Sequence, residues 1–128
     1  MNNETYERLT KAVESDTPRD GRAREAARII ASDAYRWAAI YEVDDGRVAL
    51  LGEFGTASKS TGFAVAAGAL ASSAFAILDG VAVVPILGAE SGITIGVLAA
   101  ERSEPSASGD EERDALERCA AIVIALFE

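Results

Sequence analysis

The sequence predicts an α+β domain: an antiparallel sheet with the N- and C-terminal helices packed on one face and a short lid segment on the other. Three observations lead to this class: helical apolar spacing at both ends of the chain, strand-like segments in the middle, and an uncharged small-residue segment between them. Hairpins flanked by terminal helices are typical of an antiparallel sheet with its helices on one side. We expect residues 1–128 to form one domain.

Two helices are expected at the N-terminal end. The first covers residues 3–15, where apolar residues recur at helical spacing between charged ones. A second helix is predicted to start with Thr17 as N-cap, Pro18 as first helical residue and Asp20 as capping-box partner. Its alanine-rich stripe would let it approach a neighbouring element closely.

The clearest antiparallel unit follows these helices. Residues 37–43 are rich in β-branched and aromatic side chains, and residues 47–54 form the returning strand. Between them, Asp45 and Gly46 suit the two positive φ angles of a type I′ turn. A hairpin is therefore predicted here.

Two further strands are expected at residues 81–87 and 93–101, joined by a glycine-bounded turn. Pro85 cannot donate to a ladder, so it belongs at a sheet edge or a strand end. Before these strands, residues 63–78 carry no charge. At about 16 residues this segment is short for the roughly 20 of a transmembrane helix, so we favour a buried helix, or a strand plus helix, covering the second face as a lid.

The last helix shows the strongest helical period in the chain. Ser108 and Glu111 match a capping box at its start, and Asp114 and Arg118 are spaced to pair on the solvated side. Its apolar face is expected to pack on the sheet. The residues of that face are Leu116, Cys119, Ala120, Val123, Leu126 and Phe127.

Composition excludes several classes of function. Lys and Arg total 12 against 21 Asp and Glu, and the net charge of −9 repels nucleic-acid phosphates and anionic membranes. Hydrophobic residues make up 49% of the chain, enough for a globular core. Cys119 is the only cysteine and the N-terminal segment lacks the apolar stretch of a signal peptide, so a cytoplasmic location is expected.

The order of elements resembles the GAF family from about Ala23 onward. The resemblance is carried by Trp37-Ala-Ala-Ile-Tyr41, Leu51-Gly-Glu-Phe54, Val84-Pro85-Ile86, Gly96-Val97-Leu98, Glu104-Pro105 and an acidic helix start at Asp110. It implies terminal helices that form a dimer bundle, including the helix within residues 1–16, and a small-molecule pocket on the opposite sheet face. These motifs are packing and turn signals, so they indicate fold more than function.

The resemblance and strand parity together suggest residues that line such a pocket, with Glu101 as the polar anchor. For Trp37, Tyr41 and Phe54 we favour a role in filling the core, with contact to a ligand as the alternative. The candidate ligand-binding residues are Trp37, Tyr41, Val83, Val97, Ala99 and Glu101.

Within the family, the sequence most resembles the free methionine-(R)-sulfoxide reductases. Their chemistry needs a thiolate and a resolving cysteine, whereas Cys119 stands alone on the core face of the last helix. Three of their acidic positions fall on Val81, Ala99 and Glu101, so one acid remains. With no histidine and one cysteine, bilin, haem and zinc sites are not expected either. We expect no catalytic residues, no metal and no cofactor.

Three functions are weighed on this basis. The first is a non-catalytic GAF-type sensory domain in signalling that binds a small molecule and homodimerises through its terminal helices. The second is a degenerate GAF module used only for dimerisation or protein interaction, its pocket filled by Phe63, Phe75 and the hairpin aromatics. The third, a sulfoxide reductase-like enzyme, has the least support.

Overall fold

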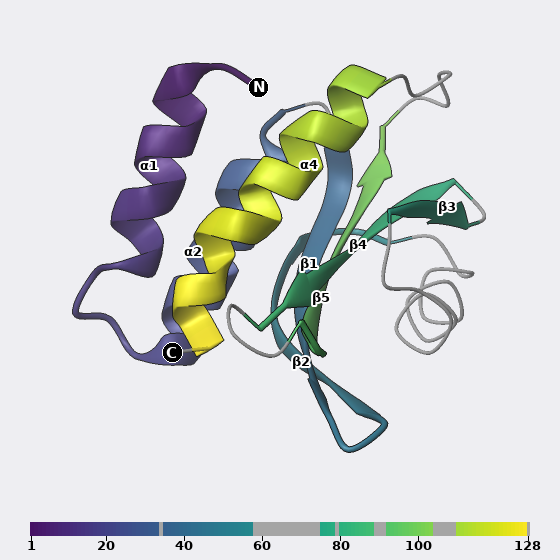
Figure 1. Ribbon diagram of the computed structural model, residues 1–128. Coiled ribbons are helices and arrows are strands. Elements are labelled where there is room, and N and C mark those ends of the chain that lie inside the picture. The colour runs from purple at the N-terminus through teal and green to yellow at the C-terminus, as the bar shows by residue number, and fades with distance from the viewer. Residues whose placement is uncertain (34, 58–74, 79, 89–91, 104–109, 128) are drawn as a thin grey trace.

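The computed structural model describes residues 1–33, 35–57, 75–78, 80–88, 92–103 and 110–127. Three α-helices and one sheet, with a 3-10 turn at the C-terminal end, make up the described elements, and the predicted α+β class is confirmed (Figure 1). In chain order they are α1 (Asn3–Val13), α2 (Arg19–Ala31), β1 (Tyr35–Asp44), β2 (Arg47–Gly55), β3 (Ala76–Leu78), β4 (Val81–Leu87), β5 (Thr94–Arg102), α4 (Asp110–Val123) and η1 (Ile124–Phe127).

The sheet has the strand order β2-β1-β5-β4-β3, and every neighbouring pair is antiparallel. The β1–β2 turn is as predicted, since Asp45 and Gly46 have φ angles of 51° and 78°. β3 falls in the segment predicted as lid, whose residues 63–74 lie outside the described part of the chain. The last described pair of β3 is Ala76 with Val83, so Pro85 lies beyond it, opposite Val97 of β5. Within the part of the chain that the structure describes, Pro85 therefore has a strand partner on the β5 side only, which is compatible with its missing N–H.

The helices gather on one side of the sheet (Figure 1). α2 packs on β1 and β2, α4 packs mainly on β4, and α1 packs on α2 and α4. The close approach of α2 depends on Gly52 of β2, where an added Cβ would lie 2.5 Å from the backbone nitrogen of Arg24. The alanine stripe of α2 thus lies directly on Gly52, and the absence of a side chain at Gly52 allows the two backbones to pack together.

A large apolar core fills the space between the helices and the sheet. The predicted faces of all three helices supply it, and Cys119 is among its buried members. The sheet residues in this core are Tyr35, Ala38, Ile40, Ala82, Val84, Ile86, Leu98 and Ala100.

Two details of the helix starts correct the predictions. α2 begins at Arg19, and Pro18 is its N-cap without a side-chain hydrogen bond, so the predicted cap at Thr17 is wrong by one residue. Pro18 has ψ of 152°, an extended value, because the chain turns into the helix only after it. The Asp20 carboxylate accepts a hydrogen bond from the Gly21 N–H at 3.0 Å. Ser108, predicted to cap the last helix, lies outside the described residues.

The predicted pair of Asp114 with Arg118 does not form. Arg118 lies over the Tyr6 ring, 4.2 Å from its centroid, because α1 runs beside α4 and offers an aromatic face. One residue position away, the Arg113 Nε donates to the Glu117 carboxylate at 2.7 Å. The tertiary neighbour thus decides which arginine of α4 makes the local ion pair.

Arg19 joins three parts of the chain near the C-terminal end. Its Nε donates to the Leu126 carbonyl at 2.7 Å, and its Nη2 donates to the Glu42 carboxylate of β1 at 2.5 Å. Its guanidinium also lies over the Phe127 ring. The start of α2, strand β1 and η1 are therefore held together by one side chain. No helix in the described part of the chain is long and apolar enough to span a membrane.

Candidate ligand-binding face

We define the far face as the side of the sheet turned away from α2 and α4. A second, smaller apolar cluster lies on it, distinct from the core under the helices. Its buried members are Trp37, Ala39, Val81, Val83, Val97 and Ala99, with Tyr41, Val43 and Val48 packed against them. Most of these side chains are small, so the far face consists of a flat aliphatic floor with Trp37 and Tyr41 standing beside it.

The structure brings all six candidate ligand-binding residues to the far face. Four of them, Trp37, Val83, Val97 and Ala99, belong to its buried cluster, and Tyr41 packs against that cluster. Glu101 of β5 is paired with Trp37 of β1, so its side chain lies on the same face of the sheet as Trp37. Strand parity in β1, β4 and β5 was sufficient for this grouping, because side chains alternate between faces.

Glu53 of β2 is a polar member of this face that the sequence reasoning missed. Its carboxylate accepts a hydrogen bond from the Trp37 Nε1 at 3.0 Å. Burial, with a smaller contribution from the negative charge of Glu53, raises the pKa of Tyr41 to about 12. Glu53 therefore influences both aromatic side chains of the far face, and Tyr41 keeps its hydroxyl proton at neutral pH.

A bulge explains why Glu53 was missed. Counting back from the Asp45–Gly46 turn places Glu53 opposite Ala38, whose side chain points toward the helices. The register shifts between Ile40 and Tyr41, so Glu53 instead pairs with Ala39 on the far face. An inserted residue changes the face of every residue beyond it. The extra residue is Leu51, and the glycine beside it, Gly52, is the sequence signal that could have indicated the bulge.

The same bulge corrects the prediction for Phe54. Without it, Phe54 would lie opposite Trp37 on the far face, but it pairs with Ala38 and is 45% exposed. Phe54 is thus not a core residue, whereas Trp37 is buried as expected. Phe75, proposed as a pocket filler, packs against the core on the helix side instead. Phe63 lies outside the described residues.

Glu101 is a buried carboxylate at the opposite end of the floor from the hairpin turn. It is 6% exposed, and its Oε2 lies 3.8 Å from the Nε of Arg36. Arg36 reaches it because the pairing of β1 with β5 also shifts at this point, between Tyr35 and Trp37. The shift also sends Tyr35 to the helix side, where its hydroxyl donates to Glu112 at 3.2 Å. Glu101 is thus an ion-paired carboxylate beside Trp37 on the far face, and carboxylate oxygens are strong hydrogen-bond acceptors.

Cys119 lies on the other side of the sheet. It is 0% exposed, its Sγ is 3.3 Å from the Met1 sulfur, and it belongs to the core under the helices. Burial raises the pKa of its thiol from 9.0 to about 12. At neutral pH the group is a protonated thiol rather than a nucleophilic thiolate. Among the described residues, no group of three or more Cys, Asp or Glu side chains could hold a metal ion.

An antiparallel sheet with the strand order β2-β1-β5-β4-β3 and helices on one face defines an α+β fold. Comparison with solved structures shows which α+β fold this is. A protein described as a GAF sensor from Burkholderia vietnamiensis is 19% identical, with 94% of this chain and 84% of that chain covered and a TM-score of 0.72. The GAF domain of an Acinetobacter phosphoenolpyruvate-protein phosphotransferase is 16% identical, covering 99% and 95%, with a TM-score of 0.72. A free methionine-R-sulfoxide reductase from Neisseria meningitidis, in complex with its substrate, is 18% identical, covering 97% and 86%, with a TM-score of 0.73.

The chain therefore has the GAF fold, as its resemblance to that family implied. No family model matches the sequence, and comparison with curated proteins finds no relative. At these identities the structural likeness establishes the fold, while activity has to be argued from the residues of this chain.

Proposed function

We propose that residues 1–128 form a non-catalytic GAF-type sensory domain of a cytoplasmic signalling protein, which binds a small molecule on the far face. The convergence of Trp37, Tyr41 and Glu101 on one aliphatic floor carries the proposal. Binding sites for small molecules combine apolar walls with a few placed polar groups, and this face has both. Glu53 and Glu101 are the polar groups, so the ligand is expected to offer hydrogen-bond donors to them.

Trp37 provides the direct test, since it is the only tryptophan of the chain and lies within the proposed site. A metabolite library screened by native mass spectrometry and thermal shift should yield a ligand that changes Trp37 fluorescence. Glu101→Gln should weaken that ligand about tenfold, because a charged acceptor is lost. Glu111→Gln removes the same charge from an exposed position on α4 and should leave the affinity unchanged. A ligand that binds Glu101→Gln as tightly as the wild type would contradict the assignment of this anchor.

The second candidate is a degenerate GAF module that serves only in dimerisation or protein interaction. One observation favours it: the six buried members of the far-face cluster are at most 1% exposed, as in a filled core. If this is correct, the library screen yields no ligand while the protein is a homodimer. A strict monomer at high concentration in light scattering would eliminate this candidate.

Homodimerisation through the terminal helices is part of both candidates. The buried stripe of α1 faces its own chain, so the dimer surface must use other residues of α1 and α4. A hollow of about 410 Å³ between these helices is lined by Tyr6, Thr10, Arg118 and Ile122, among others, and supports the proposal as a place for a partner side chain. Ile122→Glu should dissociate the dimer in analytical ultracentrifugation, whereas Ile77→Glu on β3 should not. A dimer unaffected by Ile122→Glu would place the interface elsewhere.

A sulfoxide reductase-like activity has little support in this chain. Its one thiol is buried on the helix side of the sheet, with a raised pKa, and the sheet separates it from the far face. We expect no turnover of free methionine-(R)-sulfoxide by the wild type. Turnover that disappears in Cys119→Ser would overturn the non-catalytic assignment.

A further inference from the structure

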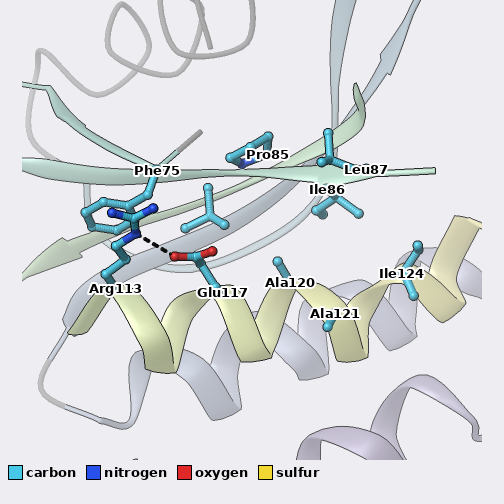
Figure 2. A pocket seen from close by; sticks show the side chains of 10 residues that line it. Phe75, Pro85, Ile86, Leu87, Arg113, Glu117, Ala120, Ala121 and Ile124 are labelled. Carbon is cyan, nitrogen blue, oxygen red and sulfur yellow. Dashed lines mark hydrogen bonds and ion pairs between the residues drawn. The ribbon is translucent and has the colours of Figure 1, made fainter. Parts of the chain in front are cut away.

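A groove lies between α4 and β4 on the helix side, separate from the far face (Figure 2). Its volume is about 390 Å³, within the range of pockets that hold small molecules. Val84, Ile86 and Leu87 line the strand side, and Ala120, Ala121 and Ile124 line the helix side. The short alanine side chains leave the space open. Its walls are therefore largely aliphatic.

One end of the groove is charged. Figure 2 shows Arg113 near one end, while Leu87 and Ile124 lie toward the other. Among the lining residues that the structure describes, Arg113 is the only cation and Glu117 the only anion, and the Arg113 Nε donates to the Glu117 carboxylate at 2.7 Å. Its two terminal amino groups have no hydrogen-bond partner among the described residues, and the side chain is 54% exposed. The outer fork of the guanidinium is free to take a carboxylate through two parallel bonds.

The shape favours a long, thin occupant. Arg113, Glu117 and Ala121 follow one stripe of α4, which Ile124 continues at the start of η1, and the 11 steps from Arg113 to Ile124 span about 16 Å at about 1.5 Å each. An added β-strand from a partner is disfavoured, because Pro85 removes a donor from β4 along the groove. The aliphatic walls suit a chain without polar groups along its length.

We propose that this groove is a second ligand site, for an amphiphile with an unbranched acyl chain and a terminal carboxylate. The carboxylate binds the outer fork of Arg113, and the chain lies along Ala121 toward Leu87 and Ile124. The net charge of −9 opposes unspecific adsorption of an anion, so saturable binding depends on Arg113. Because α4 forms one wall, the occupant contacts a terminal helix of the domain directly.

Decanoate is the probe, titrated below its micellar concentration into the full chain and followed by calorimetry and by NMR of the backbone amides. We expect saturable binding, with shifts in α4 and β4 and none at the Trp37 indole N–H, which lies on the far face. Decanol should bind about tenfold more weakly, since it lacks the charge, and hexanoate should also be weaker because less chain is buried. Shifts concentrated at Trp37 would assign the amphiphile to the far face and overturn the proposal.

Two variants test the two halves of the groove. Arg113→Gln should reduce decanoate affinity to that of decanol and leave decanol unchanged, whereas Arg24→Gln removes an exposed arginine of α2 and should change neither. Ala121→Phe fills the groove from an exposed position and should abolish binding of both probes; Ala49→Phe, exposed on β2, is its control. Unchanged decanoate affinity in Arg113→Gln, or dimerisation through the groove that Ala121→Phe disrupts, would overturn the proposal. A far-face ligand that still binds Ala121→Phe would show that the far-face site and the groove are independent, so that each proposal can fail without the other.

Discussion

The two faces of the sheet differ in what fills them. On the helix side, large aliphatic residues such as Ile40 and Leu98 interlock with three helices, and Gly52 lets α2 approach to backbone contact. On the far face the floor is alanine and valine, and the polar groups of Glu53 and Glu101 lie beside Trp37. The core under the helices is built for stability, and the far face carries the polar groups of the first proposed site. Substitutions in that core and on the far face should therefore separate stability from binding at the far face.

The largest effect is expected at Gly52, where the helix side is tightest. A side chain here meets the backbone of Arg24 and Ala23 within 2.7 Å, so α2 must move away from β2. Gly52→Val should lower the free energy of unfolding by about 4 kcal/mol. Ala49→Val, exposed on the same strand, should change it by less than about 0.5 kcal/mol. Urea unfolding followed by circular dichroism measures both, and a cost under about 1 kcal/mol at Gly52 would show that α2 is not held against β2.

Substitutions at two neighbouring residues of β5 allow a direct comparison of the two faces of the sheet. Leu98 and Val97 are each at most 1% exposed and point to opposite sides. Leu98→Ala should cost about 3 kcal/mol and leave Trp37 fluorescence unchanged. Val97→Ala should cost about 2 kcal/mol and alter that fluorescence, because it opens space in the cluster of Trp37. If both variants changed the fluorescence equally, the two faces would not be independent.

Alkaline pH should weaken the helix side first. The neutral thiol of Cys119 is favoured in the fold, so its contribution is complete below its ordinary pKa of 9.0 and is lost as the pH rises toward about 12. The loss approaches about 1.4 kcal/mol per pH unit. Between pH 8 and 10 the wild type should lose about 1.4 kcal/mol more than Cys119→Ala. Parallel curves of stability against pH for the two proteins would contradict this assignment.

Tyr41 is the far-face counterpart, and its titration is visible by ultraviolet absorbance. Its pKa of about 12 is due first to burial and second to Glu53. Glu53→Gln should lower that pKa while costing only about 1 kcal/mol of stability, since the hydrogen bond from Trp37 can be kept by the amide oxygen. Glu111→Gln should leave the titration unchanged, and an unchanged titration in Glu53→Gln would mean that burial alone sets it.

Local patterns in the sequence determined most of the elements. The helical period of the terminal helices and the Asp45–Gly46 turn follow from side-chain spacing and backbone chemistry, which act over a few residues. Strand alternation was enough to bring the six candidate residues to one face. These features need no knowledge of distant neighbours.

Tertiary structure decided what depends on contacts between distant segments. The bulges in the pairing of β1 with β2 and β5 moved Glu53 to the far face, Phe54 to an exposed position and Arg36 toward Glu101. The position of α1 beside α4 gave Arg118 an aromatic partner in place of Asp114. The fold and the floor of the site were readable because alternation is local, whereas the polar rim was not, because one inserted residue reverses every face beyond it.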